Sequence, residues 1–316
     1  MSPLETAWQA VLERPGDDRA LQVLSDALIE NGDPHGELIA LQLSPDTDRD
    51  EVDHFIARHA SGLLGGDDSR LFTWSPVFEK GFIVKATGFF MPHELEVLLT
   101  IPVGRLVREL HVHFGAERLT AILSRGLANQ LRTLWLRPES HPPPAPLQLK
   151  PLLAAVPKLE RLVDTHDTVS FAGAQSEALK SADFLGVGAF HELGEARLPA
   201  LRDLTLTLPF RRVDFDGAFL DAEVTPALES FRLFGALWPS QLESLSRSAL
   251  LRRLRQLTLL TTTDTGWYPV LLQRAEAFSH VPDLRLRPDG HHPEWIEAVR
   301  AVLPNVTIVQ SQLGTS

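Results

Sequence analysis

The hexapeptide LRDLTL occupies residues 201–206, and the nearly identical LRQLTL occupies residues 254–259. Each has apolar residues at its first, fourth and sixth positions. The residues at the fourth and sixth positions point to the same side of a short strand. This spacing recurs along the chain after residue 70. The other clear copies are Val107/Leu110/Val112, Leu131/Leu134/Leu136, Leu159/Leu162, Leu228/Phe231/Leu233, Val281/Leu284/Leu286 and Leu303/Val306/Ile308.

The copies follow one another at a nearly constant period, which we measure between their central apolar residues. A strand at residues 81–84 precedes the first copy, and the degenerate copy before Leu204 uses either Ala182/Phe184 or Leu185/Val187. The ten anchors are Phe82, Leu110, Leu134, Leu162, Ala182, Leu204, Phe231, Leu257, Leu284 and Val306. Successive anchors are 20 to 28 residues apart, which lies inside the window of leucine-rich repeats.

We therefore expect an α/β fold, a leucine-rich-repeat solenoid of about ten irregular repeats. Each repeat would add one strand to a parallel sheet on the concave face, and helices or irregular segments would form the convex face. The segments expected to form these helices or irregular arms include residues 92–100, 116–128, 241–251, 269–278 and 293–302. The asparagine that usually follows the strand is replaced by Glu139, Pro209, Ala236 and Thr262, so we expect irregular turns.

Residues 137–151 contain six prolines. Such a segment favours an extended polyproline-like conformation. It has two interpretations, a rigid loop on the rim of the sheet or a recognition site for a proline-binding module.

The first 70 residues differ from the rest in charge. They contain 15 acidic and 5 basic residues, whereas residues 71–316 contain 26 and 25. Three helix starts, at Ser2-Pro3, Asp17-Asp18 and Asp33-Pro34, combine a capping side chain with a favourable first turn. We expect three short helices in residues 1–43, with turns at Pro15-Gly16 and Gly32-Asp33.

The second of these helices has an apolar stripe formed by Leu21, Leu24, Leu28 and Ile29. A further short helix is predicted at residues 51–60, and the glycines at 65–66 mark a break. We place a helical domain at residues 1–70 and the solenoid at residues 71–316. The helices would pack on the first repeat as its N-terminal cap, because a solenoid needs its open end covered.

Residues 13–42 resemble the bacterial repeat-companion domain, which precedes leucine-rich repeats in large paralogous families of myxobacterial and planctomycete type. The family's Gly-Asp-Pro-x-Gly-Glu core matches residues 32–37, and the pair Leu41-Gln42 matches as well. The family's Tyr-Ala-Asp-Trp-Leu is replaced by residues 24–28, LSDAL, which lack both aromatic residues. The resemblance implies no catalytic residues. Asp26 and Glu37 are either solvated or helix-capping acids, or part of a docking surface for a basic partner.

The composition excludes several chemistries. There are no cysteines, which rules out disulfides, thiolate metal sites and cysteine nucleophiles. Phosphate-loop, nucleophile-elbow and His-Glu-x-x-His motifs are also absent from the sequence. From these missing motifs we expect neither a cofactor nor a catalytic site. No signal peptide or stretch of membrane-spanning length is visible, so we expect a cytoplasmic protein.

The histidines offer weak metal candidates. The run at residues 291–294, HHPE, is the best of them, and Glu294 is explained by the start of a helix. His54 and His59 have a poor spacing for two ligands on one helix, while His111 and His113 alternate along one predicted strand. We expect no metal site.

Alternation along the predicted strands identifies a binding surface, because the residues beside the anchors project from the concave face. Its candidate residues are His111, His113, Trp135, Arg137, Thr205, Thr207, Arg232, Phe234, Arg285 and Arg287. Aromatic residues and arginines are typical of protein interfaces. We therefore expect a non-enzymatic module that binds another protein. The alternatives are an anionic-ligand or nucleic-acid binder that uses the arginines, which the acidic first region argues against, and an enzyme with a dispersed site.

Overall fold

The computed structural model organises the chain into two compact units, Met1–Arg137 and Pro138–Ser316. The residues that it describes are 2–66, 70–113, 116–137, 146–165, 169–185, 190–208, 224–261, 266–287 and 293–309. Several expectations fall outside these ranges: the turns at Glu139, Pro209 and Thr262, most of the proline-rich segment, Val187, and the histidines 291 and 292. The boundary expected near residue 70 falls inside the first unit.

The first unit begins with the three expected helices, α1 (Pro3–Glu13), α2 (Asp18–Glu30) and α3 (Pro34–Leu43). The Ser2 hydroxyl accepts a hydrogen bond from the Glu5 backbone N–H at 3.2 Å, and the Glu5 carboxylate accepts one from the Ser2 N–H at 2.6 Å. These reciprocal bonds give hydrogen-bond acceptors to two backbone N–H groups at the N-terminus of α1, which the helix itself leaves unpaired. Two more helices follow, α4 (Arg49–Leu63) and α5 (Arg70–Trp74). The three-helix prediction is confirmed, and the helix expected at 51–60 lies within α4.

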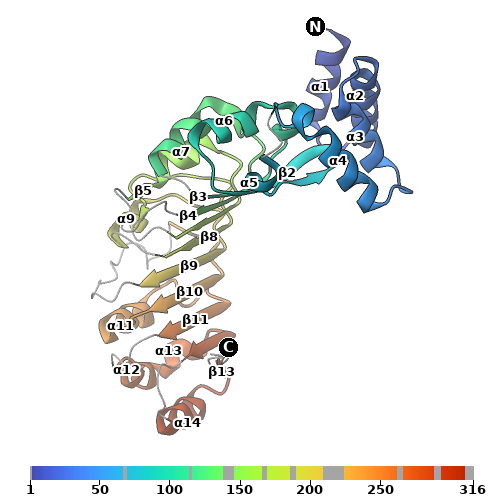
Figure 1. The fold of residues 1–316 in the computed structure, drawn as a ribbon. Coiled ribbons are helices and arrows are strands. Elements are labelled where there is room, and N and C mark those ends of the chain that lie inside the picture. The colour runs from blue at the N-terminus through green and yellow to red at the C-terminus, as the bar shows by residue number, and fades with distance from the viewer. Residues whose placement is uncertain are drawn as a thin grey trace. The chain divides into compact units, whose positions relative to one another are not determined.

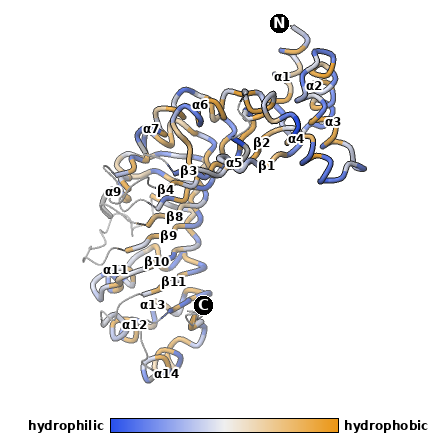
Figure 2. Tube along the Cα trace, in the orientation of Figure 1, coloured by the Kyte–Doolittle hydropathy of each residue, from blue (hydrophilic) through white to orange (hydrophobic). Residues whose placement is uncertain are grey.

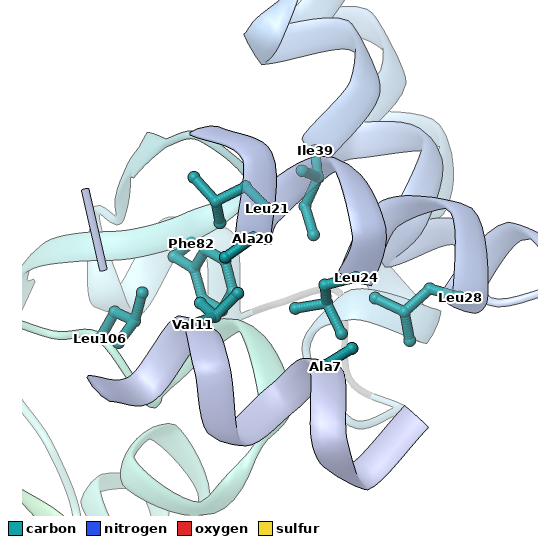
Figure 3. Close-up of a cluster of buried hydrophobic side chains, with 9 residues drawn as sticks. All are labelled: Ala7, Val11, Ala20, Leu21, Leu24, Leu28, Ile39, Phe82 and Leu106. Carbon is teal, nitrogen blue, oxygen red and sulfur yellow. The ribbon is translucent and has the colours of Figure 1, made fainter. Parts of the chain in front are cut away.

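The helices share a buried core with the first strands, as Figure 3 shows. Phe82 and Leu106 lie in one cluster with side chains of α1, α2 and α3. Its members are Ala7, Val11, Ala20, Leu21, Leu24, Leu28, Ile39, Phe82 and Leu106. The expectation that the apolar stripe packs on the first strand is confirmed for three of its residues, but Ile29 is 43% exposed. Leu28 and Ile29 are neighbours on a helix, and only one of them can face α1 and α3.

Two residues of the 32–42 segment, Gly36 and Gln42, make close contacts with neighbouring elements. A Cβ atom on Gly36 would lie 2.6 Å from the Ser25 carbonyl oxygen, so α3 can approach α2 only with glycine there. The buried Ser25 hydroxyl donates to the Gly36 carbonyl at 2.7 Å. The Gln42 side-chain oxygen accepts from the Gly81 N–H at 2.6 Å, and its amide donates to the Phe78 carbonyl at 3.4 Å. Gln42 therefore links α3 by hydrogen bonds to the hairpin at residues 77–88.

That hairpin pairs β1 (Val77–Glu79) with β2 (Phe82–Gly88) in antiparallel fashion. Its turn has positive φ at both Lys80 (51°) and Gly81 (87°), as a type I′ turn requires. The strands β3 (Glu109–His113) and β4 (Thr133–Arg137) then follow β2 in parallel. Ala86, not Phe82, stands opposite Leu110. The choice of Phe82 as the first anchor was wrong. Phe82 is the first residue of β2, and the residue of β2 that stands opposite the next anchor, Leu110, comes four positions later.

Helices cover one side of this sheet (Figure 1). They are α6 (Pro92–Thr100), a short 3₁₀ turn at Pro102–Gly104, and α7 (Ala116–Ile122), which continues as a π-helical turn, Leu123–Leu127. Leu110 and Leu134 are fully buried beneath them. Of the two forms expected for residues 92–100 and 116–128, helix or irregular arm, both segments are helical, the second with a change of helix type near its end.

Within its described ranges, the second unit is built on seven parallel strands in chain order. They are β6 (Arg161–Asp164), β8 (Ser181–Phe184), β9 (Asp203–Leu208), β10 (Ser230–Gly235), β11 (Gln256–Thr261), β12 (Asp283–Arg287) and β13 (Val306–Ile308). The predicted anchors Leu162, Ala182, Leu204, Phe231, Leu257, Leu284 and Val306 stand opposite one another in a single row. The degenerate copy uses Ala182 and Phe184, whereas Leu185 follows the strand and is 41% exposed.

Helices again cover one side of these strands (Figure 1). They are α8 (Leu149–Ala155), α9 (Phe190–Glu195), α11 (Pro239–Arg247), α12 (Tyr268–Gln273), α13 (Ala275–Ser279) and α14 (Pro293–Val302). The helix expected at 269–278 is interrupted at Arg274, and the one expected at 241–251 ends at Arg247. A small parallel sheet of β5 (Leu147–Gln148) and β7 (Val169–Ser170) was not expected.

Apolar and hydrophilic stretches alternate along the described parts of the chain (Figure 2). This follows from strands and helices that each bury one side. No helix in the described ranges combines the length and the apolar character needed to cross a bilayer.

Candidate binding surfaces

Each unit has a sheet face that is covered by none of the helices in the described ranges, and we call it the open face of that unit. On β3 the residues alternate between buried Leu110 and Val112 and half-buried His111 and His113. Strand β9 alternates in the same way. The side chains that were predicted for the concave surface lie on these open faces.

The open face of the first unit carries stacked rings. His111 stacks on Trp135, with ring centroids 5.0 Å apart and an interplanar angle of 24°. On the next row, His113 stacks on Phe89 with centroids 3.9 Å apart. Phe89 is 72% exposed and was not predicted as part of a site. Trp135 is half-buried, and Arg137 at the end of β4 is exposed.

Glu109 organises the neighbouring polar groups. Its Oε1 lies 2.9 Å from Lys85 Nζ and 2.5 Å from His111 Nε2. Partial burial acts to raise the pKa of Glu109, but hydrogen bonds from Lys85 and His111 and their charges together hold it below its ordinary value. The pKa of His113 is lowered by partial burial and by the positive charge of Arg137. His111 is therefore oriented by a carboxylate, whereas His113 favours its neutral form.

The open face of the second unit consists of ordered rows, because its strands are in register. One row places Arg232 between Thr205 and Thr258, with Arg285 next. Arg232 and Arg285 are exposed, and Thr205 is half-buried. Thr258 is 7% exposed.

The adjacent row is more apolar. Phe234 stands opposite Thr207 on one side and Leu260 on the other, and Leu260 stands opposite Arg287. All four side chains are half-buried. Phe234 and Leu260 thus form a continuous apolar stripe between a threonine and an arginine.

A polar ladder lies on the other side of the arginine row. The Ser230 hydroxyl donates to Gln256 Oε1 at 2.9 Å, and Gln256 Nε2 donates to Asp283 Oδ2 at 2.9 Å. Arg285 then donates to both oxygens of Asp283, at 2.9 and 2.8 Å. This arrangement orients the Arg285 guanidinium, and the hydrogen bonds and charge of Asp283 raise the pKa of Arg285 above its ordinary value. Sequence spacing alone could not identify it, since it depends on the register of three strands.

Asp183 on β8 stands in the same row as Arg232, opposite Thr205. Half burial raises the pKa of Asp183, while the charges of Arg161 and Arg232 act in the opposite direction. Arg232 forms no ion pair or hydrogen bond within the described ranges.

The metal candidates that lie within the described ranges do not assemble into a site, and His291 and His292 lie outside these ranges. Among the described residues, no group of three or more His, Asp or Glu side chains could hold a metal ion. His59 instead stacks on Phe55, with centroids 4.4 Å apart. His111 binds Glu109, and His113 stacks on Phe89.

Comparisons with known proteins inform the fold alone. No protein-family model matches the chain, and no curated protein matches it. Thirteen solved chains match in structure. One is a Bacteroides fragilis protein solved by the Northeast Structural Genomics Consortium, with 16% sequence identity and a TM-score of 0.50. The match covers 68% of this chain and 67% of that chain.

Proposed function

We propose that this chain is a non-enzymatic protein-binding module, a leucine-rich-repeat solenoid whose N-terminal helices cap one end. It binds a partner protein through an open sheet face. The observation that carries the proposal is the apolar stripe of Phe234 and Leu260, adjacent on β10 and β11 and bordered by Arg287. Half-exposed apolar side chains beside arginines are typical of the centre of protein interfaces.

The geometry supports a pre-organised surface. Each side chain of the stripe is held by a strand paired on both sides, so little ordering entropy is lost on binding. Arg232 is exposed on β10 and supplies a charge that a carboxylate of the partner protein would bind. The partner surface would therefore combine apolar and acidic groups.

Trp135 provides a second candidate contact, on the open face of the first unit. Its ring is half-buried and pre-oriented by His111, as binding hot spots often are. Trp135→Ala should weaken partner binding about tenfold or more. Because the ring is half-buried against His111, the same change should also lower the melting temperature.

Recognition of an anionic ligand or nucleic acid is the second candidate function. It would use Arg137, Arg232, Arg285 and Arg287, of which Arg285 is already neutralised by two bonds to Asp283. Binding to a polyanion falls steeply with salt because counterions are released, whereas an interface with an apolar centre keeps most of its affinity.

The test compares capture of partners from the source cells by the full chain and by the variants Phe234→Ala and Arg232→Ala. Val302→Ala and Arg252→Ala, which change exposed residues outside the open face, are the matched controls. We expect the amount of a captured protein to fall about tenfold with Phe234→Ala and to stay unchanged with both controls. Capture that ignores both open-face variants would overturn the proposal, and capture abolished by nuclease would favour the polyanion.

A further inference from the structure

The helices of residues 2–66 carry a groove that is separate from both open faces. Side chains of α2, α3 and α4 line it, and its volume is about 580 Å³, within the usual range of binding clefts. From its shape and charge, we propose that this groove binds a basic amphipathic helix of a partner protein.

The floor of the groove is apolar and partly open. Ile29 is 43% exposed, and Leu41 and Phe55 are half-buried beside it. Phe55 is held in place by its stacking on His59. A fixed aromatic ring with two aliphatic neighbours forms an anchor site for apolar side chains from outside.

The walls favour a helix as the occupant. The groove runs between α3 and α4, and Glu51, Phe55 and Arg58 lie on one side of α4 at spacings of four and three residues. A third helix can place its own side chains into such a groove by the usual packing of ridges into grooves. Its anchors would recur at i, i+3 or i+4, and i+7.

The charge of the surroundings determines the sign of the partner. Residues 2–66 contain 13 Asp and Glu side chains and 4 Lys and Arg side chains. Glu37 and Glu51, at the groove, are exposed and form no ion pair with any described residue. Arg58 also lines the groove, but acidic groups dominate the region. This field attracts lysines and arginines and repels nucleic acids and anionic membranes.

The experiment uses the full chain and a labelled probe peptide of about 18 residues, which is about 27 Å of helix. The probe contains only leucine and lysine, with the leucines on one side, and a matched probe has glutamate in place of lysine. Fluorescence anisotropy measures binding of each probe at about 50 and 300 mM salt. We expect the lysine probe to bind, more weakly at the higher salt, and the glutamate probe not to bind.

Variants locate the site. Ile29→Ser removes an anchor and Glu51→Lys reverses a charge at the groove, and each should weaken binding of the lysine probe about tenfold. The matched controls are Val23→Ser, 54% exposed on α2 outside the groove, and Glu13→Lys on α1. They should change binding less than twofold, and circular dichroism verifies the fold of every variant.

Three results would overturn the proposal: no binding of the lysine probe at low salt, equal binding of both probes, or equal effects of groove and control variants. The last would show a general attraction to the acidic helices. None of these results bears on Phe234 or Arg232, so the protein-binding proposal for the open face stands or falls separately.

Discussion

Lowering the pH from 7 to 4.5 should destabilise the chain through His35, which lies in the first turn of α3 and is 2% exposed. Its ring sits between Trp8 and Phe82, with centroids 5.6 and 4.9 Å away. Neither ring nitrogen has a hydrogen-bond partner of normal geometry among the described residues. Burial lowers the pKa of His35 from 6.5 to about 4, although the charge of Asp33 and the nearby Gly81 backbone act in the opposite direction.

The size of the effect follows from linkage. The unfolded chain takes up a proton on this histidine near pH 6.5, whereas the folded chain does not until about pH 4. The unfolded state therefore gains stability as the pH falls through this window, and the free energy of unfolding decreases. The pKa difference corresponds to about 3 kcal/mol at the acidic end and about 2 kcal/mol at pH 5, against a total of about 5–15 kcal/mol for a typical domain.

Urea unfolding followed by circular dichroism at several pH values measures this loss. The variant His35→Leu should lose about 2 kcal/mol less than the original chain between pH 7 and pH 5, whatever its stability at pH 7. His280→Leu changes an exposed histidine and should keep the original pH dependence. If His35→Leu and the original chain lost stability equally over this range, His35 would not be buried as a neutral ring.

Three further predictions concern the fold. Leu257→Ala should lower the free energy of unfolding by about 2–5 kcal/mol in urea titrations, because Leu257 is fully buried; a loss below about 1 kcal/mol would contradict its place in the core. Gly36→Ala should cost about 1–3 kcal/mol, since its Cβ would meet the Ser25 carbonyl, and an unchanged melting temperature would refute this contact. Deleting residues 1–60 should expose Phe82 and Leu106 and cause aggregation in size-exclusion chromatography; a soluble, equally stable product would show that the helices are not a cap.

The strands were predictable because each buries the same pair of positions. Leu204, Leu257 and Leu284 are all buried in one row, so the period of the sequence mirrors the stacking of the strands. The strand predicted at residues 81–84 is present as part of β2, but its register was not predictable, because the residue opposite Leu110 is Ala86. Phe82 is a stronger apolar signal, but it lies where β2 still pairs with β1.

Contacts between distant segments were beyond the sequence pattern. His35 follows a helix-starting proline, and nothing nearby in the chain indicates that Trp8 and Phe82 enclose it. The exposure of Ile29 likewise depends on which side of α2 is covered by α1 and α3, and the acidic groove follows from it. Alternation did predict which side chains share the open face, whereas the pairing of Arg285 with Asp283 required the structure.

Site-specific photo-crosslinking tests the central claim most directly. A photoreactive phenylalanine analogue is placed at Phe234, or at Val302, which is 46% exposed on α14, and the full chain is irradiated in extracts of its source cells. The account predicts one discrete protein adduct from position 234 that disappears with Arg232→Ala, and none from position 302. Equal adducts from both positions, or no adduct from position 234, would contradict binding through the open face.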